Sequence, residues 1–241
     1  MEKVTCRLLP FALHDGSHNM AADEVLLQSA RAGQPSLRFY GWTEATVSLG
    51  YFQASAARES HPKLLALPFV RRATGGAALV HHHELTYALA LPEPGRTGEP
   101  WLVRMHRIIA SALNRLGIAC RSASKREGEH SVLCFQQTTA GDLLLGGSKI
   151  AGSAQRRQRG SLLQHGAVLL KASPHPPGLP GILEQTGQEL SPGECQAAIA
   201  QEFLKDTGWE MHVHPWGRPE EEMISQLVVE KYSCAAWNYK R

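Results

Sequence analysis

A doubled arginine, a pair of glycines and a run of three histidines lie within one stretch of the sequence, residues 68–92. Arg71 and Arg72 precede a small-residue turn at residues 73–76, and both ends of the stretch are apolar and strand-like. Glycine lets a backbone turn tightly or approach a ligand closely, because it carries no Cβ. The amides of such a turn can bind a carbonyl or a phosphate, and arginine donates to the same anion. The alternative is a hairpin turn with solvated arginines, and this stretch alone leaves both interpretations open.

The three histidines follow this turn directly. On a strand, His81 and His83 would share a face and His82 would point the other way. Two imidazoles on one face can ligate a metal, but no cluster of acidic or cysteine ligands with recognisable spacing accompanies them. The pattern favours one histidine that orients a ligand group and two that are partly exposed, with no metal site.

A single lysine stands out in a second stretch, residues 148–157. Lys149 follows a two-glycine hairpin turn and precedes the small residues 151–154, so a ligand could approach the backbone closely. An ammonium group held there can polarise a carbonyl or stabilise negative charge that grows on an oxygen. The alternative is a solvated lysine. Arg156, Arg157 and Arg159 favour a solvated loop, which could also receive an acidic protein partner.

The five cysteines are irregularly spaced and include no C-x-x-C pair, which argues against a disulfide framework or a structural zinc site. Cys134 belongs to the short apolar run 131–135, one hairpin upstream of Lys149. By itself it would be a small core residue. A cationic neighbour lowers the pKa of a thiol and makes the thiolate available for attack. Cys134 is therefore also a candidate nucleophile.

Composition limits the class of protein. The 241 residues, 43% hydrophobic and 20% charged, fit one globular domain over residues 1–241. No run approaches the length of a membrane span, and the N-terminus lacks the apolar core of a signal peptide, so we expect a cytoplasmic protein. A net charge of +3 is too small to indicate nucleic-acid binding.

Short strands alternate with a few helices along the chain. Ser17, an N-cap candidate, predicts a helix over 17–32, and helical spacing of apolar residues predicts another over 101–116. Two further helices are expected near the C-terminus, one capped by Ser191 and one that begins at Pro219. Strands are expected at 5–10, 36–41, 46–51, 118–122, 131–135 and 160–170, with a hairpin at 142–151. This order indicates an α+β domain with helices on a mostly antiparallel sheet.

The segments RRATGGAALVHHHELTYALALP and GSKIAGSAQRRQRGSLLQHGAVLL resemble the biotin/lipoate protein ligase and octanoyltransferase superfamily. The shared features are an R-R-x-T-G-G turn with a later histidine and L-T-Y, then G-x-K-I-x-G-S-A-Q-R-R and L-Q-H-G. The resemblance covers nearly the whole chain. It implies a class II biotin/lipoate ligase-like catalytic domain, in which a mixed, mostly antiparallel sheet packed by helices forms a tunnel for an acyl chain.

Within this superfamily the chain is most similar to the single-domain, ligase-like octanoyltransferases. Cys134 and Phe135 match their nucleophilic cysteine and the aromatic residue after it, and the chain ends about where the catalytic domain would. Residues 136–141 depart from the pattern, because they lack the expected Pro-Ser and Tyr-Glu. An ATP-dependent lipoate-protein ligase and an amidotransferase of the same family are the alternatives.

The resemblance implies a cofactor-free mechanism in which Cys134 takes an octanoyl group from acyl carrier protein as a thioester. Lys149 and the amides near residues 75–78 would stabilise the carbonyl oxygen. The acceptor would be a lysine on a lipoyl-domain protein, such as the glycine cleavage H protein or a 2-oxoacid dehydrogenase E2. In the ligase alternative the same region would hold an adenylate made from ATP with magnesium, and Cys134 would take no part.

The residues that the resemblance assigns to substrate binding gather in three short segments. They are Arg71, Arg72, Thr74, Gly75, Gly76, Ala77, Ala78 and His81, then Gly152, Ser153, Ala154 and Gln155, and finally His165 and Gly166. Two other classes of function remain to be tested. One is a catalytically silent acyl- or adenylate-binding protein, which would bind a ligand but not react with a thioester. The other is a biotin ligase, which would transfer biotin instead of a medium-chain acyl group when each acid is supplied with ATP.

Overall fold

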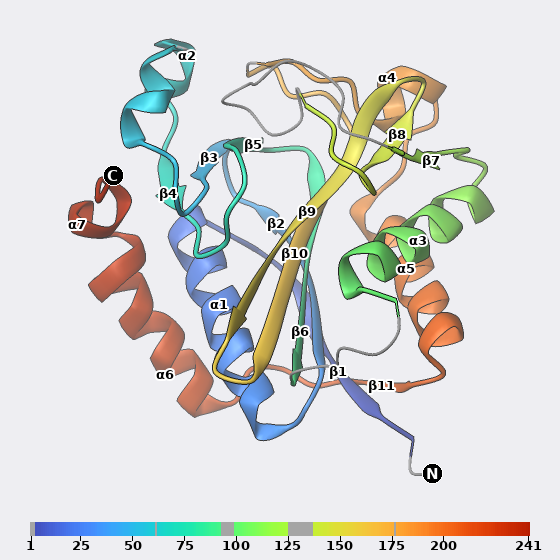
Figure 1. The fold of residues 1–241 in the computed structure, drawn as a ribbon, viewed down its shortest axis with the longest axis horizontal. Helices are drawn as coiled ribbons and strands as arrows, with labels where there is room; N and C mark the ends of the chain where they lie inside the picture. The colour runs from blue at the N-terminus through green and yellow to red at the C-terminus, as the bar shows by residue number, and fades with distance from the viewer. Residues whose placement is uncertain (1–2, 61, 93–98, 125–136, 176) are drawn as a thin grey trace.

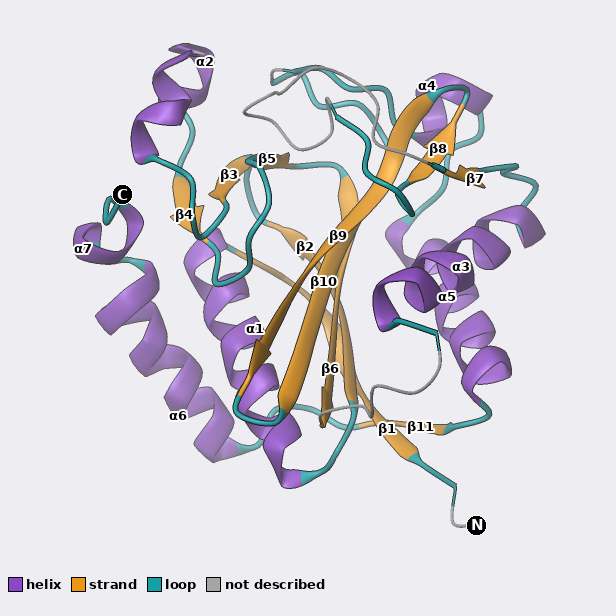
Figure 2. Cartoon of the chain, viewed as in Figure 1, coloured by secondary structure: helices purple, strands orange, loops and turns teal. Residues whose placement is uncertain are grey.

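The computed structural model describes residues 3–60, 62–92, 99–124, 137–175 and 177–241. Among these residues the strands form a large mixed sheet, in the order β11-β1-β2-β6-β10-β9-β8-β7, and a small sheet in the order β4-β3-β5 (Figures 1 and 2). In the large sheet β1 pairs in parallel with β2 and β11, and every other neighbouring pair is antiparallel. The expected α+β class and mostly antiparallel sheet are confirmed.

The strands of the large sheet are β1 (Thr5–His14), β2 (Ser36–Trp42), β6 (Glu84–Pro92), β7 (Arg121–Ser122), β8 (Leu143–Leu145), β9 (Ser148–Gln158), β10 (Ser161–Leu169) and β11 (Glu210–Val213). The small sheet contains β3 (Thr46–Leu49), β4 (Phe69–Arg71) and β5 (Leu79–His81). The predicted strand at 131–135 lies outside the described residues.

The helices are α1 (Gly16–Ser29), η1 (Ala30–Ala32), η2 (Ser55–Ser60), α2 (Pro62–Leu65), α3 (Trp101–Arg115), α4 (Ile182–Thr186), α5 (Pro192–Thr207), α6 (Arg218–Leu227), η4 (Val228–Tyr232) and α7 (Ala235–Asn238). They cover the large sheet on both faces, α1 and α6 on one side and α3 and α5 on the other (Figure 1). No described helix has the length and apolar character needed to cross a membrane.

Strand β6 contributes side chains to the hydrophobic cores on both faces of the large sheet. Tyr87, Leu89 and Leu91 belong to the core under α3 and α5, whereas Ala88 and Ala90 belong to the core under α1 and α6. Successive side chains of a strand point to opposite faces, so one central strand can hold both cores. The small alanines leave room for helix α1, which carries residues of the candidate site.

Helix α1 begins earlier than predicted. Its N-cap is Asp15, whose side chain accepts a hydrogen bond from the amide of His18 at 2.8 Å, so the helix starts at Gly16. Ser17 lies inside the helix and donates to the carbonyl of Tyr232. The prediction of Ser17 as the N-cap was wrong because an aspartate two residues earlier reaches the free amide first.

The histidine run also differs from its prediction. Strand β5 ends at His81, residues 82 and 83 form a bend, and β6 begins at Glu84. The Glu84 carboxylate accepts from the amide of His82 at 2.7 Å, which holds the bend. His81 and His83 therefore do not share a strand face: His81 is buried, and the rings of His82 and His83 stack on each other. The expectation that two of the three histidines are partly exposed is confirmed.

The turn at residues 73–76 is not a hairpin turn, since β4 and β5 do not pair and β3 lies between them. Other local predictions hold. Helix α3 ends just before Gly117, and α5 has the predicted capping box of Ser191 and Glu194. The β8–β9 hairpin turns at Gly146 and Gly147, whose φ values of 55° and 90° suit glycine.

Candidate functional site

The residues after β4 form a loop that Arg72 holds from within. Its Nη2 donates to the carbonyls of Gly75 and Ala77 at 2.8 and 2.7 Å, and its Nη1 donates to Ser48 on β3. Gly76 adopts a φ of 91°, which glycine accepts without strain. Because the guanidinium binds the carbonyls of the loop, the loop amides are turned away from it. Within the described residues we find no acceptor for the amides of Gly75, Gly76 and Ala77.

Arg71 has a different place. It is fully buried and donates to the backbone carbonyls of Gly50, Gln53 and Asn238 at 2.9, 2.6 and 2.9 Å. These bonds tie β4 to the C-terminal helices. The structure thus places Arg71 away from the other predicted site residues, in a structural position rather than as an anion donor.

A cavity lies between this loop with the small sheet and the middle of strands β9 and β10. The space open to a water-sized probe within it is about 70 Å³, so the cavity is narrow in this structure. Nine predicted residues line it: Arg72, Gly76, Ala77, His81, Gly152, Ser153, Ala154, His165 and Gly166. Met20, Leu79 and Ala167 add apolar wall. We call this space the central cavity.

Lys149 lies directly behind the wall of the central cavity. Its side chain is almost fully buried and forms an ion pair with Asp142 at 2.7 Å. A Cβ at Gly152 would lie 2.5 Å from Cε and 2.8 Å from Nζ of the lysine, so glycine is needed for this approach. The amide and hydroxyl of Thr139 donate to the same Asp142 oxygen and fix it. The alternative of a solvated lysine is therefore wrong, because the side chain of Lys149 is buried in an ion pair.

His165 on β10 connects the cavity to a buried carboxylate. Its Nδ1 lies 2.8 Å from Asp23 of helix α1, and its Nε2 lies 2.7 Å from the hydroxyl of Thr74. Asp23 also accepts from Arg38 and from Tyr40, each at 2.9 Å. Because the Asp23 oxygens accept from Arg38 and Tyr40, Nδ1 of His165 is assigned as the donor to Asp23, and Nε2 accepts from Thr74. Burial and the Asp23 charge raise the pKa of Tyr40, which stays a donor.

His81 on β5 forms a second carboxylate–histidine pair in the same wall. Its Nδ1 hydrogen-bonds to Glu84 and its Nε2 lies 2.8 Å from the hydroxyl of Ser48. The ring stacks on Trp42 at 3.8 Å between centroids. Burial lowers the pKa of His81, although the Glu84 carboxylate acts in the opposite direction and Arg72 adds to the lowering. His81 is therefore a fixed, neutral ring.

Ser153 leads from the cavity to a third buried histidine. Its hydroxyl lies 2.8 Å from Nε2 of His106 on α3, and Nδ1 of His106 lies 2.6 Å from the carbonyl of Gly141. A carbonyl only accepts, so Nδ1 carries the proton and Ser153 donates to Nε2. Burial lowers the pKa of His106. Gln155, also predicted for the site, instead donates to Gln164 at 2.8 Å.

Three predicted residues remain. Gly75 supplies a carbonyl to Arg72 and does not line the central cavity. Ala78 is buried and lines a neighbouring hollow, on the other side of β5. Cys134, the predicted nucleophile, lies outside the described residues together with Phe135.

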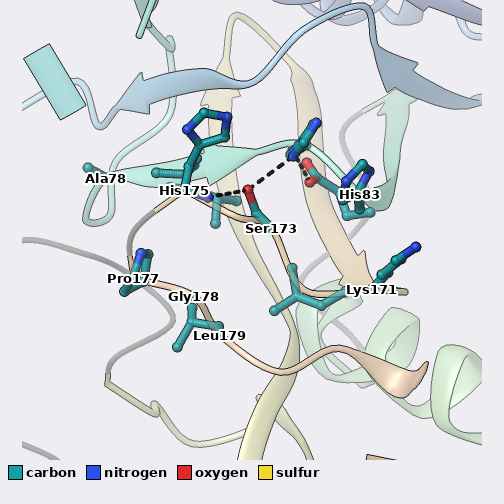
Figure 3. A pocket seen from close by; sticks show the side chains of 13 residues that line it. Ala78, His83, Lys171, Ser173, His175, Pro177, Gly178 and Leu179 are labelled. Carbon is teal, nitrogen blue, oxygen red and sulfur yellow. Dashed lines mark hydrogen bonds between the residues drawn. The ribbon is translucent and has the colours of Figure 1, made fainter. Parts of the chain in front are cut away.

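The neighbouring hollow lies between β5 and the segment after β10, and we call it the outer hollow (Figure 3). His82 and His175 meet there edge to face at 5.5 Å, and Ser173 lies 3.0 Å from Nδ1 of His82. Figure 3 shows Ser173 between His175 and His83. Within the part of the chain that the structure describes, no group of three or more histidine, cysteine or acidic side chains is arranged to hold a metal ion.

Sequence reasoning missed four residues of the site: Asp23, Glu84, Asp142 and His106. Asp23 reads as one of two acidic residues early in a helix, and Glu84 and Asp142 read as polar residues at strand starts. The fold brings Asp23 to His165, Glu84 to His81 and Asp142 to Lys149, and it brings His106 to Ser153. A usable signal for Asp23 is its place beside apolar residues of α1, where a buried carboxylate needs a partner.

Comparisons with known proteins agree with this architecture. Residues 15–203 match the family model of the lipoyl protein ligase A/B catalytic domain. Octanoyltransferase LipM of Symbiobacterium thermophilum is 32% identical, with 98% of each chain covered, and that of Bacillus subtilis is 31% identical over 100% of each. The fold resembles lipoate-protein ligase A bound with ATP, at a TM-score of 0.81 and 23% identity over 98% of this chain and 99% of the other.

A lipoate protein ligase from Thermoplasma acidophilum, studied with its E2 lipoyl domain, has the same fold. Its TM-score is 0.73 at 20% identity, covering 99% of this chain and 97% of the other. The match over residues 15–203 and the relatives above 30% identity together decide the family. The chain belongs to the lipoyl protein ligase A/B catalytic-domain family.

Proposed function

We propose that this protein is an octanoyltransferase of protein lipoylation, with residues 1–241 as one catalytic domain. It would move an octanoyl group from a carrier protein to the ε-amine of a lysine on a lipoyl-domain protein. The observation that carries the proposal is Lys149, a buried ammonium that touches the cavity wall where Gly152 leaves it room. The full-length relatives named octanoyltransferase support the same reaction.

The geometry explains how an acyl carbonyl would be activated. An ammonium and backbone amides that point to the place where negative charge grows stabilise an oxyanion, by about 2.7–4 kcal/mol for a good donor. Lys149 would supply the first, and the amides of Gly76 and Ala77 would supply the second. Asp142 keeps the lysine side chain in place through the 2.7 Å ion pair.

The nucleophile of the proposal is Cys134. Its thiolate would attack the thioester carbonyl of the donor, and the carrier's thiol would leave, which gives an octanoyl thioester on the enzyme. The amine of the acceptor lysine would then displace Cys134 and form the amide. Splitting the transfer in this way replaces one difficult step by two easier ones.

An acidic carrier protein fits the rim of the cavity. Lys240 lies 3.4 Å from the ring centroid of Tyr51, and Arg241 and Arg156 lie within 6 Å of the same ring. Arg156 also donates to the carbonyl of Ala73 at 2.8 Å, beside the loop that borders the cavity. Opposite charge steers association and sets orientation. We assign this cation cluster to the donor, octanoyl-acyl carrier protein.

The ATP-dependent ligase is the second candidate, since the fold matches lipoate-protein ligase A bound with ATP. There Arg72, the loop amides and Lys149 would hold an adenylate. The arrangement of Arg72 favours the transferase, because its Nε, Nη1 and Nη2 all donate to protein oxygens. The transferase needs no cofactor, whereas the ligase needs ATP and magnesium. The cytoplasmic location expected from the N-terminal sequence stays a prediction.

Intact-mass analysis tests the proposal. The protein is mixed with octanoyl-acyl carrier protein in the absence of ATP, and wild type should gain one octanoyl group that Cys134→Ala does not gain. Adding a lipoyl-domain protein should move that mass to the acceptor. Acceptor modification that requires ATP and survives Cys134→Ala would contradict the transferase and support the ligase.

A further inference from the structure

The last chemical step needs a proton acceptor that the mechanism above does not name. The ε-amine of the acceptor lysine must lose a proton to become an amide nitrogen, whether the acyl group is held as a thioester or as an adenylate. Lys149 does not suit this role, because it is a cation in an ion pair with Asp142. The described wall of the central cavity offers two histidines for this role, His81 and His165.

Two histidines of the central cavity present a lone pair, and their surroundings differ. His81 has a pKa lowered by burial and by the charge of Arg72, and Trp42 covers its ring. His165 has the Asp23 carboxyl group on Nδ1, which would stabilise the imidazolium that forms when Nε2 takes up a proton. Both histidines have a carboxylate on Nδ1 and a hydroxyl on Nε2, which is the arrangement of a general base, but only His81 has its ring face covered by Trp42.

We propose that His165 is the general base for amide formation, with Asp23 as its positioning residue and the Thr74 hydroxyl as its resting partner. This inference rests on the proposed acyl transfer but holds for either acyl donor. The incoming amine takes the place of Thr74 as the donor to Nε2. As the C–N bond forms, Nε2 accepts the amine proton, and the bond from the carbonyl carbon to the sulfur breaks with its electron pair. The imidazolium then returns the proton to the leaving thiolate.

The structure supports this assignment in three ways. His165 lines the central cavity, whereas Thr74 and Asp23 are buried behind it. The three groups form an unbroken chain with distances of 2.8 and 2.7 Å. Arg38 holds Asp23 from the opposite side at 2.9 Å, so the carboxylate cannot turn away from the ring. The chain joins helix α1, strand β10 and the loop after β4 at one point.

Two matched variants separate a base from a structural role. His165→Gln removes the base but keeps an amide that can bond to Thr74, whereas Thr74→Val removes that hydrogen bond and keeps the base. The exposed His212→Gln on β11 is the control for a histidine-to-glutamine change elsewhere. Asp23→Asn is less informative, because it also leaves the buried Arg38 without its carboxylate.

The assay compares two acceptors under single-turnover conditions, a lipoyl-domain protein and hydroxylamine, an amine that is uncharged at neutral pH and needs no base. We expect His165→Gln to lower transfer to the lysine by about 100-fold or more and transfer to hydroxylamine by less than about 5-fold. Thr74→Val should lower both by less than about 10-fold, and His212→Gln should leave both unchanged.

Equal losses of transfer to the two acceptors in His165→Gln would contradict the assignment of His165 as the general base. A loss of lysine transfer in Thr74→Val as large as that in His165→Gln would contradict it too. An unchanged lysine rate in His165→Gln would overturn it as well. If His165→Gln does not fold, the size of the loss in lysine transfer by Thr74→Val decides, since only a holding role predicts a loss above about 10-fold there. A wild type that acylates neither acceptor, with or without ATP, would instead defeat the proposed function.

Discussion

The central cavity and the outer hollow are separated by strand β5 and use the same residue type in opposite ways. In the central cavity His81 and His165 each bind a buried carboxylate through Nδ1 and a hydroxyl through Nε2. In the outer hollow His82 and His175 meet each other and Ser173, and no carboxylate bonds to either ring within the described residues (Figure 3).

The difference shows what makes a histidine usable for chemistry. A carboxylate on one ring nitrogen fixes the tautomer and the direction of the lone pair on the other. His82 stacks on His83, and its Nδ1 partner is the Ser173 hydroxyl, which can donate or accept and so does not fix the tautomer. The triple-histidine motif therefore contributes one residue, His81, to the wall of the central cavity, and the functional base that we propose comes from a distant strand.

Lys149→Met should have the largest effect. Removing the ammonium takes away a donor to the developing oxyanion, so acyl transfer should fall by about 10²–10³-fold. It also leaves Asp142 buried without its partner, so thermal unfolding should show a loss of about 3–5 kcal/mol. The double variant Lys149→Met/Asp142→Asn should regain most of the stability but none of the activity. Recovery of activity together with stability would show that Lys149 is only structural.

Gly152→Ala should have the next largest effect on acyl transfer. A Cβ there would lie 2.5 Å from Cε of Lys149 and would push the ammonium from its place, so transfer should fall by up to about 100-fold. Gly193→Ala, on helix α5 with open space around the added Cβ, is the matched control. It should keep full activity and gain up to about 1 kcal/mol, because alanine favours a helix. Equal activity in both variants would contradict the placement of Lys149.

His81→Gln and His83→Gln compare the buried and the exposed end of the same histidine run. His81→Gln disturbs the buried bonds to Glu84 and Ser48, so we expect a loss of about 1–3 kcal/mol in urea unfolding. His83→Gln changes an exposed ring and should stay within about 0.5 kcal/mol of wild type. Similar losses for both would remove the distinction between the two sides of β5.

The smallest expected effect is on the pH dependence of stability. Burial lowers the pKa of both His81 and His106 below the ordinary value of 6.5, so the unfolded chain binds more protons as the pH falls through 6.5. The contribution of these two histidines to the free energy of unfolding should be complete above pH 6.5 and should decrease below it. Chemical unfolding at pH 7.5 and 5.5 should show a smaller decrease in His106→Gln than in wild type, whereas His83→Gln should not change it.

Local structure was predictable wherever neighbouring residues decide it. The Gly146–Gly147 turn, the Ser191 cap and the spacing of apolar residues in α3 each rest on contacts within a few residues. The predicted start of α1 was wrong because two cap candidates compete. The predicted strand through the three histidines was wrong because the Glu84 side chain accepts from the amide of His82 and holds a bend there.

The site was predictable from motif residues but not from their partners. Nine of the predicted residues line one cavity, yet Asp23 and Glu84 carry no local signal that links them to His165 or His81. Arg71 and Arg72 look alike in the sequence, and only the fold distinguishes them. Arg71 donates to three backbone carbonyls and does not line the cavity, whereas Arg72 lines it and binds the loop at its rim. Long-range pairs of this kind depend on the strand order, which the sequence pattern alone does not give.

One measurement tests the central claim, that the cavity beside Lys149 transfers an acyl group without ATP. The enzyme, octanoyl-acyl carrier protein and an unmodified lipoyl-domain protein are mixed in the presence of an ATP-removing enzyme, and the mass of the lipoyl domain is followed. The account predicts one octanoyl group on its lysine, formed by wild type and not by Lys149→Met. A lipoyl domain that stays unmodified until ATP and free octanoate are added would contradict it.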